Sequence, residues 1–196
     1  MGMEMAFDAM IDLSDEALLV LYANGDPAAA RSLTLRLGPL AYRVAMRMLR
    51  DRAEAEDVAQ EALLRLWRIA PDWRQGEAKV STWLYRVVSN LSTDRLRRRR
   101  GVALEAVAEP EDERPSAVEV MIDSDRATAL QAALAALPDR QRQAVVLRHL
   151  EGLSNPEIAE VMEIGVEAVE SLTARGKRAL ASLLAGRREE LGYGHG

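Results

Sequence analysis

The stretch STWLYRVVSNLSTDRLRRRR, residues 81–100, predicts an amphipathic helix that ends in a run of arginines. Ser81 is a suitable N-cap, because its hydroxyl can accept a hydrogen bond from a main-chain N–H of the first turn. The apolar residues that recur at helical spacing are Leu84, Val87, Val88 and Leu91. Arg95 takes the place where this stripe would continue, and Leu96 follows one position late. The residues of the opposite face are Trp83, Arg86, Asn90, Asp94, Arg97 and Arg98.

This opposite face has the kinds of side chain that a nucleic-acid surface needs. Cations bind phosphates, aromatic rings stack on bases, and amides can form hydrogen bonds with base edges. The alternative is a solvated amphipathic helix with a charged end, since basic runs are common on protein surfaces. The stretch alone favours neither interpretation.

The composition of the whole chain predicts an all-α protein. Its 196 residues suffice for one domain or two small ones, and 48% of them are hydrophobic, so cores can be buried. Ala, Leu, Arg and Glu dominate, and all four favour helices. Runs of β-branched or aromatic residues, which are typical of strands, are few.

Neither an enzyme nor a metal or cofactor site is expected. Cysteine is absent, which excludes disulfides and thiolate chemistry. The two histidines, His149 and His195, lie far apart, and no cluster has metal-ligand spacing. The sequence also lacks a constellation of nucleophile, base and orienting group. A binding protein without a cofactor is therefore the expected class.

The charge and targeting features favour a cytoplasmic protein with local basic surfaces. The sequence has no long apolar run and no N-terminal signal pattern, so we expect no membrane insertion. The net charge of -5 argues against uniform coating of DNA, but it is compatible with basic faces on an acidic body.

Several helices are expected before residue 81. Their ranges are 14–24, 26–38, 39–50 and 51–68, and their expected N-caps are Ser14, Asp26 and Asp51. Gly38 and Pro39 mark the expected boundary between the second and third helices. Asp51 and Glu54 have the spacing of a capping box. A loop over residues 71–80, which contains Trp73, then precedes the arginine-ended helix.

The composition changes after Gly101. Residues 101–124 hold seven carboxylates against one basic residue, Arg114, and include two prolines. Such a segment buries too little apolar surface to fold alone, so we expect an acidic flexible linker.

The second half of the chain predicts a helix-turn-helix. The expected helices cover residues 125–137, 139–150, 155–162 and 166–184. Ser154 and Glu157 form a capping box, and Glu163 to Gly165 form a tight turn. A short helix, a turn and a longer helix fit the arrangement that places the second helix in the major groove. The expected packing positions are Ile158, Ala159, Ile164 and Val169.

These segments, in this order, resemble the extracytoplasmic-function sigma factors, the two-domain branch of the bacterial sigma-70 family. Residues 51–68 resemble region 2.2, residues 81–100 resemble regions 2.3 and 2.4, and residues 137–162 resemble region 4. The implied fold is two small helical domains joined by the acidic linker. The implied divisions are a region 2 domain over 1–100, the linker over 101–124, a region 4 domain over 125–187 and a tail over 188–196.

The resemblance implies a function and its partners. The chain is expected to direct promoter-specific initiation by core RNA polymerase, through the β′ clamp helices and the β subunit, under an anti-sigma factor. The residues implied to bind core polymerase are Asp57, Gln60, Glu61, Leu64 and Trp67. Those implied to bind the −10 element are Trp73, Trp83, Asn90, Asp94, Arg97 and Arg98. Those implied to bind the −35 element are Ser171, Ala174, Arg175, Lys177 and Arg178.

The recognition helix departs from the family pattern. At four positions of this helix the family usually has hydroxyl-bearing or basic residues. This chain has Gly165, Glu170, Ser171 and Leu172 there, and Glu163 replaces the usual turn glycine. Glutamates near phosphates are repulsive, although a glutamate can accept a hydrogen bond from cytosine N4. An altered promoter preference is one interpretation, and a shift of this domain towards protein contacts is another.

Two other functions compete with promoter recognition. The acidic recognition helix motivates a sigma-like decoy that binds an anti-sigma factor without directing transcription, although a decoy does not need the arginine run. An ordinary helix-turn-helix regulator would need a ligand or dimerisation domain, which residues 14–100 do not resemble.

Overall fold

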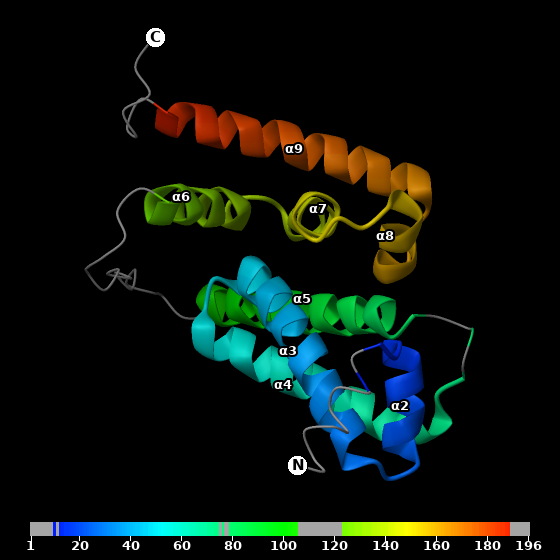
Figure 1. Ribbon diagram of the computed structural model, residues 1–196. Helices are drawn as coiled ribbons and strands as arrows, with labels where there is room; N and C mark the ends of the chain where they lie inside the picture. The colour runs from blue at the N-terminus through cyan, green and yellow to red at the C-terminus, as the bar shows by residue number, and fades with distance from the viewer. Residues whose placement is uncertain (1–9, 11, 75, 77–78, 106–122, 189–196) are drawn as a thin grey trace.

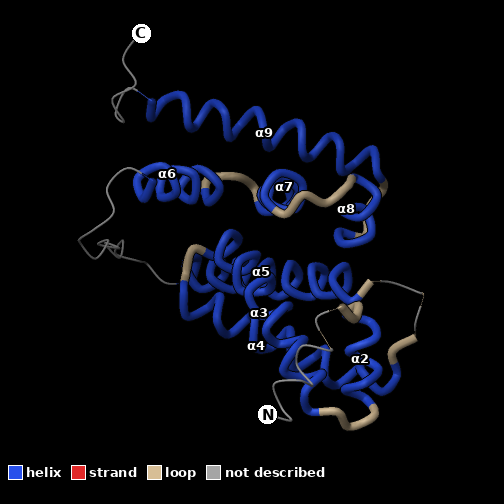
Figure 2. Tube along the Cα trace, in the orientation of Figure 1, coloured by secondary structure: helices blue, strands red, loops and turns tan. Residues whose placement is uncertain are grey.

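The computed structural model describes residues 10, 12–74, 76, 79–105 and 123–188 (Figure 1). Throughout these residues the regular elements are helices, and Figure 2 shows only helices and loops in them. The predicted all-α class is therefore confirmed. The sequence predicts a loose lead-in over residues 1–13, of which residues 1–9 and 11 lie outside the described residues, whereas Met10 is buried. Most of the expected tail, residues 189–196, also lies outside the described residues.

The first group of helices, which we call the N-terminal bundle, forms around α3. Its elements are α2 (Asp15–Ala23), α3 (Pro27–Leu49), α4 (Arg52–Ile69), the 3-10 turn η1 (Ala70–Asp72) and α5 (Val80–Glu105). Their facing sides bury apolar residues completely, including Leu33, Val44, Leu66 and Leu84. This packing holds α4 and α5 side by side, with α3 across both.

The second group, the C-terminal bundle, lies against the first through α8, α7 and α6 (Figure 1). Its elements are α6 (Asp123–Ala135), α7 (Asp139–Val145), the π-helical turn η2 (Val146–Leu150), α8 (Asn155–Met162) and α9 (Val166–Arg188). Helix α9 runs along the side away from the N-terminal bundle (Figure 1).

The predicted N-caps before α2, α3, α4 and α8 are confirmed. Ser14 Oγ accepts from Ala17 N–H at 3.2 Å, and Asp26 Oδ1 accepts from Ala28 N–H at 2.8 Å. Asp51 Oδ1 accepts from Glu54 N–H at 3.0 Å. Before α8, the full capping box of Ser154 and Glu157 is present. Each cap satisfies N–H groups that the first turn of a helix leaves free.

The expected helix boundary at Gly38 and Pro39 is wrong, because α3 continues through both residues. Pro39 cannot donate to the carbonyl of Leu35, but Leu35 and Pro39 are both exposed, so water can reach that carbonyl. Leu37 and Ala41 on either side are buried. A continuous apolar stripe therefore stabilises the helix across the proline.

The expected start of the arginine-ended helix at Ser81 is also wrong. Helix α5 begins at Val80, whose N–H donates to the Glu16 carboxylate of α2 at 3.0 Å. Burial alone would raise the pKa of Glu16, but hydrogen bonds from Val80, its own N–H and Ser14, with the charge of Lys79, lower it overall. The Glu16 carboxylate of α2 thus caps the start of α5, which is the role expected of Ser81.

Helix α5 also extends past the arginines to Glu105, so the expected linker starts too early. Of residues 101–124, the first five end α5 and the last two begin α6, while residues 106–122 lie outside the described residues. The single helix expected over 139–150 is instead α7 followed by the π turn. Residues 142–147 are all buried there, because this segment lies between α9 and the N-terminal bundle.

Candidate nucleic-acid and protein interface

A groove of about 410 Å³ runs between α4 and α5. Its lining residues are Asp57, Gln60, Glu61, Leu64, Arg65, Leu91, Asp94, Arg95 and Arg98. Four residues predicted to bind polymerase and two predicted to bind the −10 strand therefore share one groove. Leu64 is 49% exposed, which leaves an apolar side chain open among charged ones.

Ion pairs between α4 and α5, and within α4, hold the charged side chains of this groove in place. Arg95 of α5 pairs with Glu54 of α4 and lies 3.7 Å from Asp57. Arg65 Nε donates to Glu61 at 2.8 Å, and this hydrogen bond lowers the pKa of Glu61. Arg95 interrupts the apolar stripe of α5 because it joins the two helices. Sequence reasoning noted the interruption but missed this partner, since the spacing along one helix carries no information about the next.

Trp67, the remaining predicted polymerase contact, does not line this groove. Its ring packs on Tyr22 of α2, with ring centroids 4.6 Å apart at a tilt of 48°. The side chain is half-buried against the core. Packing of α2 on α4 therefore accounts for this tryptophan, and its polymerase contact remains a prediction.

Two tryptophans lie together on either side of the loop before α5. Trp73 and Trp83 meet edge to face, with ring centroids 6.4 Å apart and an interplanar angle of 87°. Both rings are half-buried. The indole Nε1 of Trp73 is buried and has no hydrogen-bond partner among the described residues. The pair thus presents half-exposed aromatic surface, on which an unstacked base can stack, while the Trp73 Nε1 donor itself is buried.

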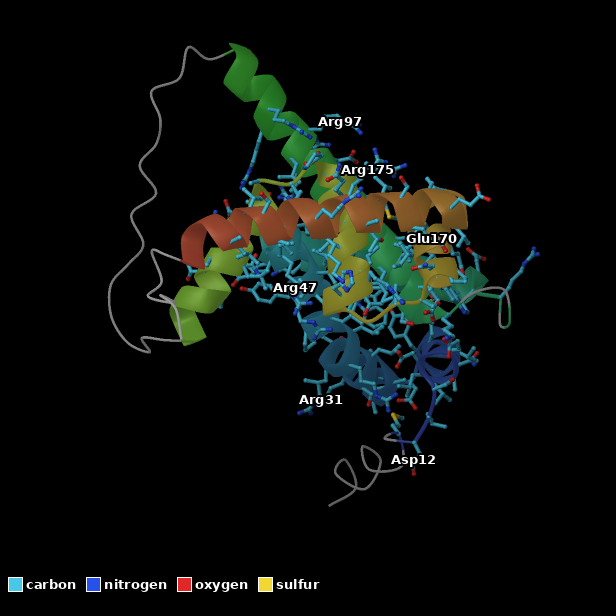
Figure 3. The ribbon with its side chains drawn as sticks, turned by 90° about the horizontal axis from the view of Figure 1, so that it is seen from above. Asp12, Arg31, Arg47, Arg97, Glu170 and Arg175 are labelled. Atoms are coloured by element: carbon cyan, nitrogen blue, oxygen red, sulfur yellow. The ribbon has the colours of Figure 1, made fainter. Side chains whose placement is uncertain are left out.

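The four arginines at positions 97–100 of α5 differ in their ion pairs and in how open they are to a ligand. Arg99 pairs with Asp51 at 2.5 Å, and Arg100 pairs with Asp139. Arg97 is 75% exposed and lies 3.6 Å from Asp94 (Figure 3). Arg98 is exposed at the edge of the groove. Arg97 and Arg98 are therefore better placed than the last two arginines for phosphate contacts, and Asn90 is exposed two turns earlier.

Helices α8 and α9 form the predicted helix-turn-helix. Ile158 and Val169 are completely buried between them, and Ala159 and Ile164 pack on the same core. Glu163 ends α8 in the left-handed conformation, with φ of 54°, at the place where a glycine is usual. Such a φ strains a residue with a side chain, so Glu163 is held there by its surroundings.

The predicted −35 residues divide between two sides of α9. At about 100° per residue, Ser171, Ala174, Arg175 and Arg178 share one side and are exposed. Lys177 instead lines a small apolar groove beside His149. Burial, followed by the charges of Lys177 and Arg148, lowers the pKa of His149.

The acidic residues of α9 are also exposed. Glu170 Oε accepts from Asn155 Nδ2 at 3.4 Å, which ties the start of α9 to α8 (Figure 3). Glu167 lies exposed in the first turn. An acidic patch thus adjoins the exposed cations of the same helix.

A close helix crossing that sequence reasoning missed holds α9 in place. Gly176 is buried inside α9, and a Cβ there would lie 2.6 Å from Val145 Cγ2 and 3.1 Å from the Gln141 carbonyl oxygen of α7. A glycine in the interior of a predicted helix was the available signal, because its helix propensity is poor.

Comparison with known proteins places these surfaces in two family regions. Residues 33–102 match the model of Sigma-70 region 2, and residues 127–180 match that of Sigma-70, region 4. The ECF RNA polymerase sigma factor SigE of Mycolicibacterium smegmatis is 35% identical over 184 residues, which cover 89% of this chain and 71% of the relative. The chain belongs to the ECF RNA polymerase sigma factors.

Other relatives give the same family. SigM of Mycobacterium tuberculosis is 35% identical to this sigma factor over 91% of the chain and 88% of the relative. SigW of Bacillus subtilis is 32% identical over 73% of the chain and 82% of the relative.

Solved structures share the fold of this sigma factor. CnrH, solved in complex with the cytosolic domain of CnrY, has a TM-score of 0.67 and 26% identity, over 88% of this chain and 97% of that one. RpoE of Bartonella quintana, solved with the anti-sigma factor NepR, has a TM-score of 0.64 at 20% identity, over 79% of this chain and 96% of that one. The second likeness concerns the fold alone.

In this sigma factor, the groove between α4 and α5 falls within the region 2 match, and α8 with most of α9 falls within the region 4 match. Among the described residues, no cluster of three or more His, Cys, Asp or Glu side chains could hold a metal ion. No helix in the described ranges is long and apolar enough to cross a membrane.

Proposed function

We propose that this sigma factor binds core RNA polymerase, directs it to promoters and helps to melt the −10 element. The groove between α4 and α5 carries the proposal. Asp57, Gln60 and Glu61 line it from α4, and Asp94 and Arg98 line it from α5. A protein-binding surface and a nucleic-acid surface therefore adjoin, which suits a subunit that holds promoter DNA against its polymerase.

Each part of the chain has a role in this proposal. The N-terminal bundle, residues 15–105, binds the β′ clamp helices and the −10 element. The C-terminal bundle, residues 123–188, binds the β subunit and the −35 element. The acidic segment between the two bundles lies in the polymerase channel. The chain acts in the cytoplasm, where the polymerase works, as a specificity subunit without catalysis of its own.

The −10 strand is read, in this proposal, by Trp73, Trp83 and Asn90. The arginines supply affinity for phosphates, which carry no sequence information. The edge-to-face tryptophan pair, whose rings are both half-exposed, supports a stacking surface for an unstacked base. On α9, Ser171, Ala174, Arg175 and Arg178 face the −35 element, and Lys177 contributes at the margin.

An anti-sigma factor controls the chain in this proposal. CnrH, which shares the fold, was solved in complex with the cytosolic domain of CnrY, so a protein partner binds that relative. The exposed Leu64 among carboxylates of the groove is a surface of the kind that protein partners use. Such a partner would compete with polymerase for the same residues.

Two substitutions on opposite sides of the groove test the division of roles. Asn90→Ala is expected to lower open-complex formation about tenfold while the affinity for core polymerase is unchanged, because one amide contact to a base is lost. Gln60→Ala is expected to weaken binding to core polymerase instead. Permanganate reactivity of promoter thymines measures melting, and fluorescence anisotropy measures core binding. Equal losses in both assays for Asn90→Ala would contradict the roles assigned to α4 and α5.

A decoy function is the second candidate, and the acidic residues Glu167 and Glu170 on the exposed side of α9 favour it. A decoy would bind an anti-sigma factor and polymerase surfaces without promoter-specific transcription. The exposed Arg97 and Arg98 argue against it, since a decoy has no need of phosphate contacts.

A further inference from the structure

The ion pairs between the two bundles all place the positive residue on the same bundle. Among the described residues, five ion pairs connect the bundles, and in each the cation belongs to the N-terminal bundle. The cations are Arg43, Arg47, Lys79, Arg86 and Arg100, and the carboxylates are Glu151, Glu157, Glu163 and Asp139. The C-terminal bundle therefore presents an acidic face to a basic one.

Glu151 is the centre of this interface. Its side chain is only 1% exposed, although it follows the last helical turn of η2. Arg43 donates to both of its oxygens, from Nε at 3.1 Å and from Nη2 at 2.7 Å. Arg47 donates to Oε1, and Tyr85 Oη donates to Oε2 at 3.2 Å. We call these four residues the Glu151 latch.

Among the described residues, every hydrogen-bond partner of the Glu151 side chain comes from the N-terminal bundle. Arg43 and Arg47 lie one turn apart on α3, and Tyr85 lies on α5. A fork-to-fork arginine–carboxylate pair is among the stronger charge-assisted interactions in proteins, and here the carboxylate is buried while Arg43 is half-exposed. The carboxylate is therefore satisfied only while the bundles are together, and it must be rehydrated when they separate.

The other pairs lie beside the residues proposed to contact the −10 strand. Arg86, one turn after Trp83 on α5, pairs with Glu163 at 3.4 Å. Lys79, the residue before the same helix, pairs with Glu157 at 3.4 Å. Glu157 and Glu163 of the helix-turn-helix thus pair with cations that could otherwise bind phosphates of a DNA strand. Glu163 does so from the left-handed position at which a glycine would relieve strain.

We propose that the free chain holds itself closed through the Glu151 latch, and that closure masks two cations, Lys79 just before α5 and Arg86 within it, from nucleic acid. The bundles separate when the polymerase competes for their surfaces. The masking half rests on the proposed function, because it assigns these cations to DNA. The closure half does not.

Fluorescence resonance energy transfer within the free chain tests closure. The sequence has no cysteine, so Ala53→Cys on α4 and Ala181→Cys on α9 supply labelling sites, and both positions are exposed. The parent is expected to be mainly closed at low salt and to open as salt rises, because exposed ion pairs are screened. Glu151→Gln is expected to lower the closed-to-open ratio at least tenfold, and Arg43→Gln to lower it in the same direction.

Glu167→Gln is the matched control, because it removes the same charge from an exposed residue of the same bundle. Its closed-to-open ratio is expected to stay within about twofold of the parent. Circular dichroism establishes that each variant keeps its helices. A Glu151→Gln chain with parental helix content and a parental closed-to-open ratio would overturn the latch.

Binding of a fluorescent single-stranded DNA of −10-like sequence to the free chain tests the masking. Glu151→Gln is expected to bind it several-fold more tightly than the parent and than Glu167→Gln. A Glu151→Gln chain that opens but binds the single-stranded DNA no more tightly than the parent would overturn the proposal that closure masks Lys79 and Arg86. Neither assay contains polymerase, so a failure here is distinct from a failure of the proposed role in transcription.

Discussion

Arg142 of the C-terminal bundle donates a hydrogen bond from Nη1 to the carbonyl oxygen of Met48 at 2.6 Å. Met48 lies in the last turn of α3, so a side chain of one bundle bonds the end of a helix in the other. The same guanidinium donates to the carbonyls of Leu134 at 2.8 Å and Ala135 at 2.5 Å, at the end of α6. The carbonyl ends of two helices carry partial negative charge, which favours a cation between them.

This contact predicts a large effect of Arg142→Met. The substitution removes all donors at once and leaves buried carbonyls without partners, so we expect a loss of about 3 kcal/mol in the free energy of unfolding. Urea denaturation measures it. Arg140→Met, at an exposed neighbour on α7, is the control and is expected to change stability by less than about 0.5 kcal/mol. Equal effects at the two positions would show that the buried bonds contribute nothing.

The glycines of α9 and α5 predict opposite effects of the same substitution. Gly176→Ala is expected to destabilise the protein by about 1–3 kcal/mol, because its Cβ would press on Val145 and the Gln141 carbonyl. Gly101→Ala has open space around it and is expected to stabilise α5 by about 0.5–1 kcal/mol. Thermal unfolding compares them, and a gain in stability at Gly176 would contradict the close crossing of α7 and α9.

Tyr85 predicts a distinctive titration. Burial, then the charge of Glu151 and its hydrogen bond, raise the pKa of Tyr85 to about 12. A raised pKa means that the neutral form stabilises the fold at pH values below 10, and that this contribution is lost as pH rises through about 12. Ultraviolet titration is expected to show a late-ionising tyrosine that Tyr85→Phe removes.

The same titration reports on Glu151. Glu151→Gln is expected to lower the pKa of Tyr85, because it removes the negative charge that disfavours the phenolate. A Tyr85 pKa that does not change in this variant would contradict the contact across the bundles.

Glu170 predicts how the recognition helix meets DNA. Glu170→Lys is expected to strengthen non-specific DNA binding or to alter the −35 preference. It is also expected to steepen the salt dependence of the DNA affinity by the amount that corresponds to about one additional phosphate contact. Glu170→Gln, which removes repulsion without adding a cation, is expected to lie between the parent and the lysine variant. An unchanged promoter profile together with an unchanged salt dependence would exclude this side of α9 from the DNA contact.

The parts of the fold that could be predicted from the sequence are those that depend on neighbours along the chain. Ser154 and Glu157 are three residues apart, so their capping box can be recognised from spacing. Ile158 and Val169 were expected to pack because the helical period places them between α8 and α9. The ordered set of regions then indicated the family.

The parts that could not be predicted depend on distant residues. Arg43 and Glu151 are 108 residues apart, and no local pattern connects them. Pro39 indicated a helix end, but burial of Leu37 and Ala41 against other helices decided otherwise. Glu16 caps α5 from 64 residues away, which moved the expected start of that helix. At Pro39 and at the start of α5, a tertiary contact outweighed the local preference.

Transcription with purified components tests the central claim most directly. The chain is added to core RNA polymerase, and run-off transcripts are measured on a library of promoters from the genome that encodes it, with core polymerase alone as the control. Transcripts from a discrete set of promoters that require the chain are the predicted result. Tight binding to core polymerase without any promoter-specific transcript would contradict the account and favour a decoy.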